Sequence, residues 1–141
     1  MPTAELCATL LAFAAAVTPY DKDGVACPEL KAVERAELTR MVCPGQRCGP
    51  SAAYEWGADT VYYWQRYHDG SPLLHSLIVH ELVHHLQYHH DAPRERCRDL
   101  VCLEEEAYDA QRRYMHENHL GYFADALGDP PACERPEDYD L

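Results

Sequence analysis

The chain is 141 residues long and 47% hydrophobic, so the sequence predicts a folded protein with a buried core. Its 24 acidic residues against 12 basic ones give a formal net charge of −12. A surface this negative repels phosphate backbones and anionic lipid headgroups, which disfavours nucleic acid and membrane surfaces as partners. No apolar stretch reaches the roughly 20 residues that a membrane-spanning helix needs.

The seven cysteines favour an oxidising compartment, so we expect a periplasmic or secreted protein with two or three disulfides. The odd count leaves at least one thiol unpaired or joined to another chain. Cys43 and Cys48 flank a short loop and form the easiest local bridge. Cys97 and Cys102 can pair only if a helix begins after Cys97, because five helical residues turn the two side chains about 140° apart.

The N-terminal stretch ELCATLLAFAAAV has the apolar run of a signal peptide, but no Lys or Arg precedes it. Leu6, Leu10, Phe13 and Val17 recur at helical spacing. The pattern therefore favours a first packed helix over a signal. An exported protein would then carry its signal upstream of this numbering.

Short strands are predicted in the next part of the chain. Residues 30–35 indicate a strand, and residues 36–43 indicate one or two helical turns. Residues 52–64 predict two strands joined by a turn, because Gly57 interrupts two runs of aromatic and β-branched residues. The second of these strands covers residues 60–64.

Two long helices are predicted after the strands. Ser71 can cap a helix and Pro72 suits the first helical position, so the first long helix is expected to run from there to about His90. The second is expected over residues 99–118, ending at Gly121.

The first long helix contains His80-Glu81-x-x-His84 within the stretch LIVHELVHHLQYHH. Side chains four residues apart share one face of a helix, so the two imidazoles can bind one metal ion. Glu81 projects about 60° from His84, toward the open side of that ion. Its carboxylate can there take a proton from a metal-bound water. The apolar residues around the motif indicate a buried helix.

The remaining histidines of this helix are expected to play no part in binding the metal. His85 is rotated about 100° from His84, and His89 and His90 lie at the end of the helix. We expect these three to be solvated or to support the ligands indirectly. His75 is expected to point away from the pair. A histidine-rich helix also produces this motif by chance more easily than an average helix does.

A catalytic zinc needs a third protein ligand. Three consecutive glutamates follow in the second long helix, and helical geometry selects Glu104 among them. It falls on an apolar arc with Leu100, Val101, Ala107, Tyr108, Gln111 and Met115. Glu105 and Glu106 turn toward the side that carries Asp109. A carboxylate within an apolar stripe is costly unless a cation compensates it; the alternative is that Glu104 belongs to a solvated acidic run.

His80-Glu81-x-x-His84 followed by Glu104-x-x-Ala107-Tyr108 resembles the gluzincin metallopeptidase pattern. VHELVHHLQ with EEEAYDAQ is similar to small bacterial proteins with a minimal zincin-like domain, which resemble the minigluzincins. The likeness covers roughly residues 4–125. It implies that His80, His84 and Glu104 are zinc ligands and that Glu81 is the general base.

The chain departs from the family pattern at two points. Tyr108 stands where gluzincins usually have Asp, which leaves open what orients the first histidine. The residue that stabilises the oxyanion is not assigned by the resemblance. Tyr114, His116 and His119 are candidates by their proximity to Glu104 in the sequence.

The expected fold is α+β and zincin-like, with an N-terminal helix and a small, mostly antiparallel sheet packed on the His80–His84 helix. Residues 60–64 are the candidate edge strand for pairing with extended substrate. The expected function is hydrolysis of a peptide bond in a peptide or protein substrate, with one zinc per chain. Two alternatives remain: a zinc-binding domain without turnover, and a secreted, disulfide-stabilised interaction module. The oligomeric state stays open.

The proline-rich, acidic segment 128–141 is expected to form a tail beyond a metallopeptidase domain at 1–127. Its stretch PACERPE resembles the cysteine-switch segment of matrix metalloproteinase propeptides. A Cys133 thiolate could occupy the open position of the zinc, as that resemblance implies. The alternative is that Cys133 forms a disulfide that pins the tail.

Overall fold

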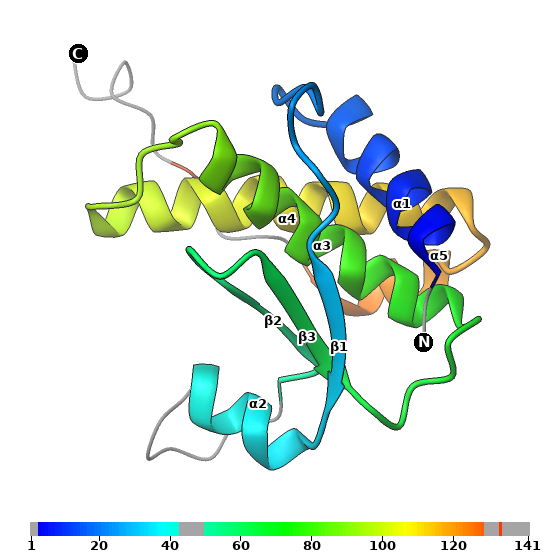
Figure 1. Ribbon diagram of the computed structural model, residues 1–141. Coiled ribbons are helices and arrows are strands. Elements are labelled where there is room, and N and C mark those ends of the chain that lie inside the picture. The colour runs from blue at the N-terminus through cyan, green and yellow to red at the C-terminus, as the bar shows by residue number, and fades with distance from the viewer. Residues whose placement is uncertain (1–2, 43–49, 129–132, 134–141) are drawn as a thin grey trace.

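The computed structural model describes residues 3–42, 50–128 and 133 (Figure 1). The helices are α1 (Ala4–Ala16), α2 (Arg35–Val42), α3 (Pro72–His89), α4 (Cys97–Glu117) and α5 (Gly121–Ala126). The strands are β1 (Glu29–Val33), β2 (Ala52–Glu55) and β3 (Thr60–Trp64). The fold is α+β as predicted, and every predicted strand and helix has a counterpart. The expected Cys43–Cys48 bridge lies outside the described residues.

The sheet is mixed, so the expectation of a mostly antiparallel sheet is only partly correct. Its strand order is β1-β3-β2. The central strand β3 runs parallel to β1 and antiparallel to β2, with Val61 opposite both Leu30 and Tyr54. The expectation that residues 60–64 form an edge strand is therefore wrong. β3 takes the centre because Val61 and Tyr63 are the most completely buried side chains of the sheet. Among the described residues, β1 and β2 form the two edges.

Helix α3 is the element around which the others are arranged, and it contacts α1, α4, β2 and β3 (Figure 1). Its start is the predicted one: the Ser71 hydroxyl accepts a hydrogen bond from the Leu74 amide at 3.3 Å, and Pro72 follows. The helix is buried almost all round from Ile78 to Gln87. Polar side chains on this helix are therefore held inside the protein, where each needs a partner.

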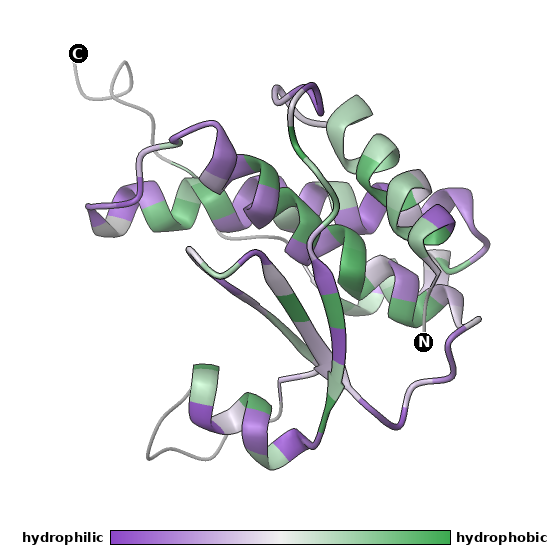
Figure 2. Cartoon of the chain, in the orientation of Figure 1, coloured by the Kyte–Doolittle hydropathy of each residue, from purple (hydrophilic) through white to green (hydrophobic). Residues whose placement is uncertain are grey.

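The expected N-terminal helix is present as α1, whose apolar side chains dominate its colouring in Figure 2. Leu10, Leu11 and Ala14 are buried in the core. A disulfide between Cys7 and Cys27 ties the helix to the segment before β1. Residues 4–16 are thus part of the packed structure, in agreement with the interpretation as a helix.

Helix α4 begins at Cys97, two residues earlier than predicted. Cys102 forms a disulfide with Cys133 and not with Cys97. The sulfur of Cys133 is therefore committed, and the cysteine-switch interpretation is wrong: the disulfide that pins residue 133 to α4 is the correct alternative. Gly121 does not end the helical region as predicted but begins α5, after a turn in which His119 has a φ of 63°.

The setting of the protein follows in part from these features. The two disulfides, Cys7–Cys27 and Cys102–Cys133, indicate an oxidising, extracytoplasmic environment. Within residues 3–42 and 50–128, none of the helices has the length and apolar character that crossing a membrane requires.

Candidate metal centre

The two histidines of the motif point from α3 toward one carboxylate on α4. His80 and His84 are both buried, at 8% and 7% exposure. Their Nε2 atoms lie 3.4 Å and 2.5 Å from Oε1 of Glu104. The structure thus brings together the three residues that the sequence singled out. The prediction that Glu104 is the glutamate facing the histidines agrees with these distances.

A second carboxylate, that of Glu81, lies beside the same group. His80, Glu81 and His84 are all buried, and each offers a ligand atom within 4.8 Å of the other two, so the group could hold a metal ion. Glu81 and Glu104 are thus the two carboxylates beside the histidines. One oxygen of Glu104 lies close to both Nε2 atoms.

The protonation of His84 is set by Gln87, a fully buried residue one turn further along α3. The amide nitrogen of Gln87 donates to the Leu103 carbonyl at 2.9 Å and to Glu106 Oε1 at 3.0 Å. Its oxygen must then accept the Nδ1 proton of His84, at 2.7 Å. With Nδ1 donating to Gln87, Nε2 of His84 faces Glu104, where it can donate to the carboxylate when the ring is protonated or bind a metal when the ring is neutral.

Glu106 has a different neighbourhood from the one that the helical pattern predicted. The pattern turned it toward Asp109, but its carboxylate accepts hydrogen bonds from the Tyr20 hydroxyl at 2.5 Å and from Gln87. Its long side chain reaches back toward α3, which helical angles measured at Cβ do not capture. Glu105 points elsewhere and accepts the backbone N–H of Cys133 at 2.8 Å.

Gln111 is placed to orient the first histidine, His80. Its Oε1 lies 3.0 Å from Nδ1 of His80, and the side chain is buried. A histidine bound to a metal commonly donates its other ring nitrogen to an acceptor of this kind. Tyr108, in the place where gluzincins usually have Asp, packs its ring edge-on against His80 at a centroid distance of 4.6 Å. The amide of Gln111 therefore supplies the acceptor, and Tyr108 supplies packing.

The charges of the group favour a bound cation. Burial alone would raise the pKa of Glu104, but hydrogen bonds from His80 and His84 hold it well below its usual value. Burial alone would lower the pKa of His84, but the carboxylates of Glu104 and Glu81 raise it above its usual value. Two imidazoles and two carboxylates therefore lie side by side, and either protons on the imidazoles or a bound cation can balance the carboxylate charge. Both imidazole and carboxylate are good ligands of zinc.

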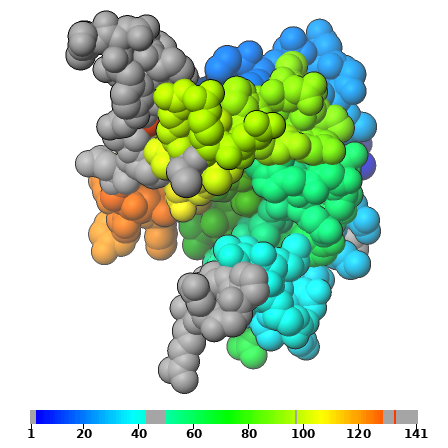
Figure 3. Space-filling view, turned by 90° about the vertical axis from the view of Figure 1, so that its left-hand side faces the viewer, coloured from blue at the N-terminus to red at the C-terminus, as the bar shows by residue number. Residues whose placement is uncertain are grey.

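The group opens into a cavity of about 770 Å³. In Figure 3 the surface is hollowed between the orange C-terminal segment and the cyan and teal atoms of α2 and the β2–β3 hairpin, with green atoms of α3 set back between them. The free edge of the sheet contributes to one wall, because Ala52, Ala53 and Tyr54 of β2 line the cavity. Tyr108 and Trp56 also line it, and the Trp56 ring lies tilted against that of His84 at a centroid distance of 5.5 Å.

The three residues named by proximity as oxyanion candidates are not among those that line this cavity. Tyr114 packs edge-on against Phe13 of α1 at 5.3 Å. His116 lines a different hollow, with Val17 and Arg113. Tyr108 does line this cavity, and its pKa is raised by burial and by the carboxylates of Glu104 and Glu81, so its hydroxyl keeps its proton.

The other histidines of α3 include one that is buried and others that form hydrogen bonds. His85 is 1% exposed, so of the two alternatives that were expected for it, the solvated one is wrong. It is buried because Tyr54 from β2 and the carbonyl of Ala26 cover it, at 2.9 Å and 2.8 Å, and neither contact is visible in a helical pattern. His75 bonds the Asp69 carbonyl at 2.7 Å, away from the motif as expected.

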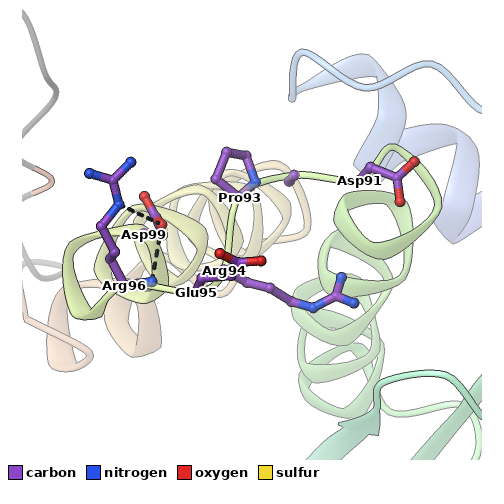
Figure 4. A pocket seen from close by; sticks show the side chains of 7 residues that line it. Asp91, Pro93, Arg94, Glu95, Arg96 and Asp99 are labelled. Carbon is purple, nitrogen blue, oxygen red and sulfur yellow. Dashed lines mark hydrogen bonds and ion pairs between the residues drawn. The ribbon is translucent and has the colours of Figure 1, made fainter.

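A smaller cavity of about 400 Å³ lies in the connection between α3 and α4. Figure 4 shows that charged side chains surround it, including Arg94, Arg96 and Asp99, with Arg96 and Asp99 paired to each other. No histidine lines it, and it holds no set of metal-ligating side chains. Of these two cavities, the one with the His80–His84 group is therefore the candidate metal site.

Gln87 and Gln111 are the site residues that pattern reasoning missed. Both stand at spacings that could have revealed them: Gln87 follows His84 by three residues, and Gln111 follows Glu104 by seven. A polar side chain that repeats at helical spacing next to a ligand is placed to bond that ligand or its partner. Comparison with protein-family models, with curated proteins and with solved structures found no match.

Proposed function

We propose that this protein is a zinc-dependent peptidase in which His80, His84 and Glu104 hold the metal and Glu81 is the general base. The observation that carries the proposal is the convergence of both Nε2 atoms on the Glu104 carboxylate, with Glu81 beside them and a cavity in front. Two histidines, a glutamate and an open position form a ligand set that catalytic zinc sites use. The peptidase comprises residues 1–127 in this proposal, with 128–141 as its tail.

When bound, zinc supplies a Lewis acid that polarises a carbonyl and lowers the pKa of water toward 7. The remaining roles in this proposal belong to residues of the chain. Glu81 takes the proton of the attacking water and returns it to the leaving amine. Gln87 and Gln111 accept the Nδ1 proton of each imidazole, so that each ring is aligned with its Nε2 toward the metal. Tyr108 can donate its hydroxyl to the oxygen on which negative charge develops.

The substrate class in this proposal is an extended peptide. β2 is an edge strand of the sheet in the described part of the chain, and three of its residues line the cavity that contains the histidines. An extended chain can add to such an edge through backbone hydrogen bonds. Its scissile bond would then lie over the metal centre. This role moves from residues 60–64, where the sequence placed it, to residues 52–55.

The test is a Glu81→Gln variant assayed for zinc content and for cleavage of a broad peptide library. It should keep its zinc and lose activity, since the amide cannot accept the proton. The matched control is Glu105→Gln, which changes a carboxylate that faces Cys133 and should leave both properties unchanged. Zinc-loaded wild-type protein that cleaves no peptide in the library would refute the peptidase proposal and leave a zinc-binding domain without turnover.

A further inference from the structure

A second group of metal-ligating side chains lies on the next turn of α3. His85 and His89 are four residues apart on this helix, and Asp59 reaches them from the turn between β2 and β3. Oδ1 of Asp59 is 2.7 Å from Nε2 of His89 and 3.6 Å from Nδ1 of His85. The ligand atoms of the three residues all lie within 4.8 Å of one another. In Figure 1 the end of the β2–β3 hairpin points toward the middle of the helical layer.

The tautomer of His85 is fixed by the backbone. Its Nε2 lies 2.8 Å from the Ala26 carbonyl, which can only accept, so Nε2 carries the proton. The lone pair is therefore on Nδ1, and it faces Asp59 and the Tyr54 hydroxyl, the latter at 2.9 Å. A buried imidazole whose far nitrogen donates to a carbonyl has the arrangement that metal-binding histidines commonly show.

The turn that carries Asp59 is built to aim it at the helix. Gly57 and Asp59 have positive φ angles of 89° and 48°, and aspartate tolerates this conformation better than most residues. The Thr60 hydroxyl donates to the Ala58 carbonyl at 2.9 Å and closes the turn. His85 is buried at 1% exposure, whereas the Asp59 side chain is 54% exposed. The group thus has a rigid inner ligand and an entry path from solvent.

We propose that Asp59, His85 and His89 form a second metal site, separate from the His80–His84 centre, that binds a divalent first-row transition metal such as zinc. Two imidazoles and one carboxylate suit this class of ion better than calcium or magnesium, which prefer oxygen ligands. Zinc lies about 2.0–2.2 Å from nitrogen and oxygen ligands, so ligand atoms around it are roughly 3.3 Å apart. The distances of 2.7 Å and 3.6 Å in this group bracket that spacing.

The site is expected to bind more weakly than the first one. Without metal, the Tyr54 hydroxyl donates to His85 Nδ1 and His89 donates to Asp59, and both hydrogen bonds must be given up. The exposed position of Asp59 also lets water compete for its carboxylate. A metal held there ties the β2–β3 turn to α3, so its binding should raise the melting temperature of the protein.

The experiment is a zinc titration of the full, oxidised chain by calorimetry, with metal counted per chain. We expect two zinc ions in the wild type, and one in His89→Ala and in Asp59→Asn. A His80→Ala variant, which disables the first site, should keep one zinc that a further His89→Ala change removes. This background separates the second site from the proposed catalytic one.

The matched control is His90→Ala, an exposed histidine at the same helix end that bonds the Asp21 carbonyl. It should retain both ions. Zinc numbers and affinities that are unchanged in His89→Ala and Asp59→Asn would overturn the proposal. So would an equal loss in His90→Ala, since that result would mean that zinc binds surface histidines without selection.

Discussion

Replacement of Glu104 by alanine tests the ligand set most finely, because two other glutamates adjoin it on α4. Structural zinc sites with four ligands bind with about 10–16 kcal/mol, so one ligand contributes roughly 2.5–4 kcal/mol. Since 1.4 kcal/mol corresponds to a factor of ten, Glu104→Ala should raise the dissociation constant of zinc about 100- to 1000-fold. The assay is competition with a chelator of known affinity.

The controls are Glu105→Ala and Glu106→Ala. Glu105 accepts a hydrogen bond from the backbone N–H of Cys133, so Glu105→Ala should not change the zinc affinity. Glu106 holds Gln87, which in turn orients His84, so its loss should weaken zinc binding by about tenfold at most. A larger loss of zinc affinity in Glu106→Ala than in Glu104→Ala would refute the reasoning. It would mean that the third ligand is Glu106, on a different face of α4 from Glu104.

Two further changes test the surroundings of the site. Gln111→Leu removes the acceptor for His80 Nδ1 and should weaken zinc binding about 10- to 100-fold. The control, Arg113→Leu on the exposed face of α4, should leave the zinc affinity unchanged. Equal zinc affinities in the two variants would contradict the orienting role of Gln111. Cys133→Ser opens a disulfide with a sequence separation of 31 residues and should lower the free energy of unfolding by roughly 3–4 kcal/mol in a denaturant titration. Its peptidase activity should stay unchanged, and an increase would revive the cysteine-switch interpretation.

The helices were predictable because their signals are local. Ser71 and Pro72 mark the start of α3. The position of Glu104 on an apolar arc was enough to predict that this side chain faces the histidines. Helical spacing relates side chains within about one turn, so ligands on one helix, and their direction, follow from the sequence. The packing of α4 on α3 then brings the two halves of the site together.

The sheet order was not predictable in the same way. β1 and β3 pair in parallel although α2 and β2 separate them in the chain, and no local pattern encodes that pairing. The same limit explains His85, whose burial depends on Tyr54 and Ala26 from distant parts of the chain. The proposed function is affected directly, because the edge strand beside the cavity comprises residues 52–55 and not residues 60–64.

The end of α4 shows a third kind of error. Gly121 was expected to stop the helix, since glycine often follows a helix end. The stop instead comes from Asn118 and from His119, which adopts the left-handed conformation. Gly121 then begins a new short helix, and a side chain at this position would approach His116 at 3.4 Å. The residue type alone did not show whether this glycine ends one helix or begins the next.

The zinc content of the purified protein tests the central claim most directly. After exhaustive dialysis, elemental analysis should find at least one zinc per chain, which a strong chelator removes and added zinc restores. The His84→Ala variant should retain none at the first site, because one of the two Nε2 ligands is gone. A folded wild-type chain that carries no zinc and takes none up from solution would contradict the account.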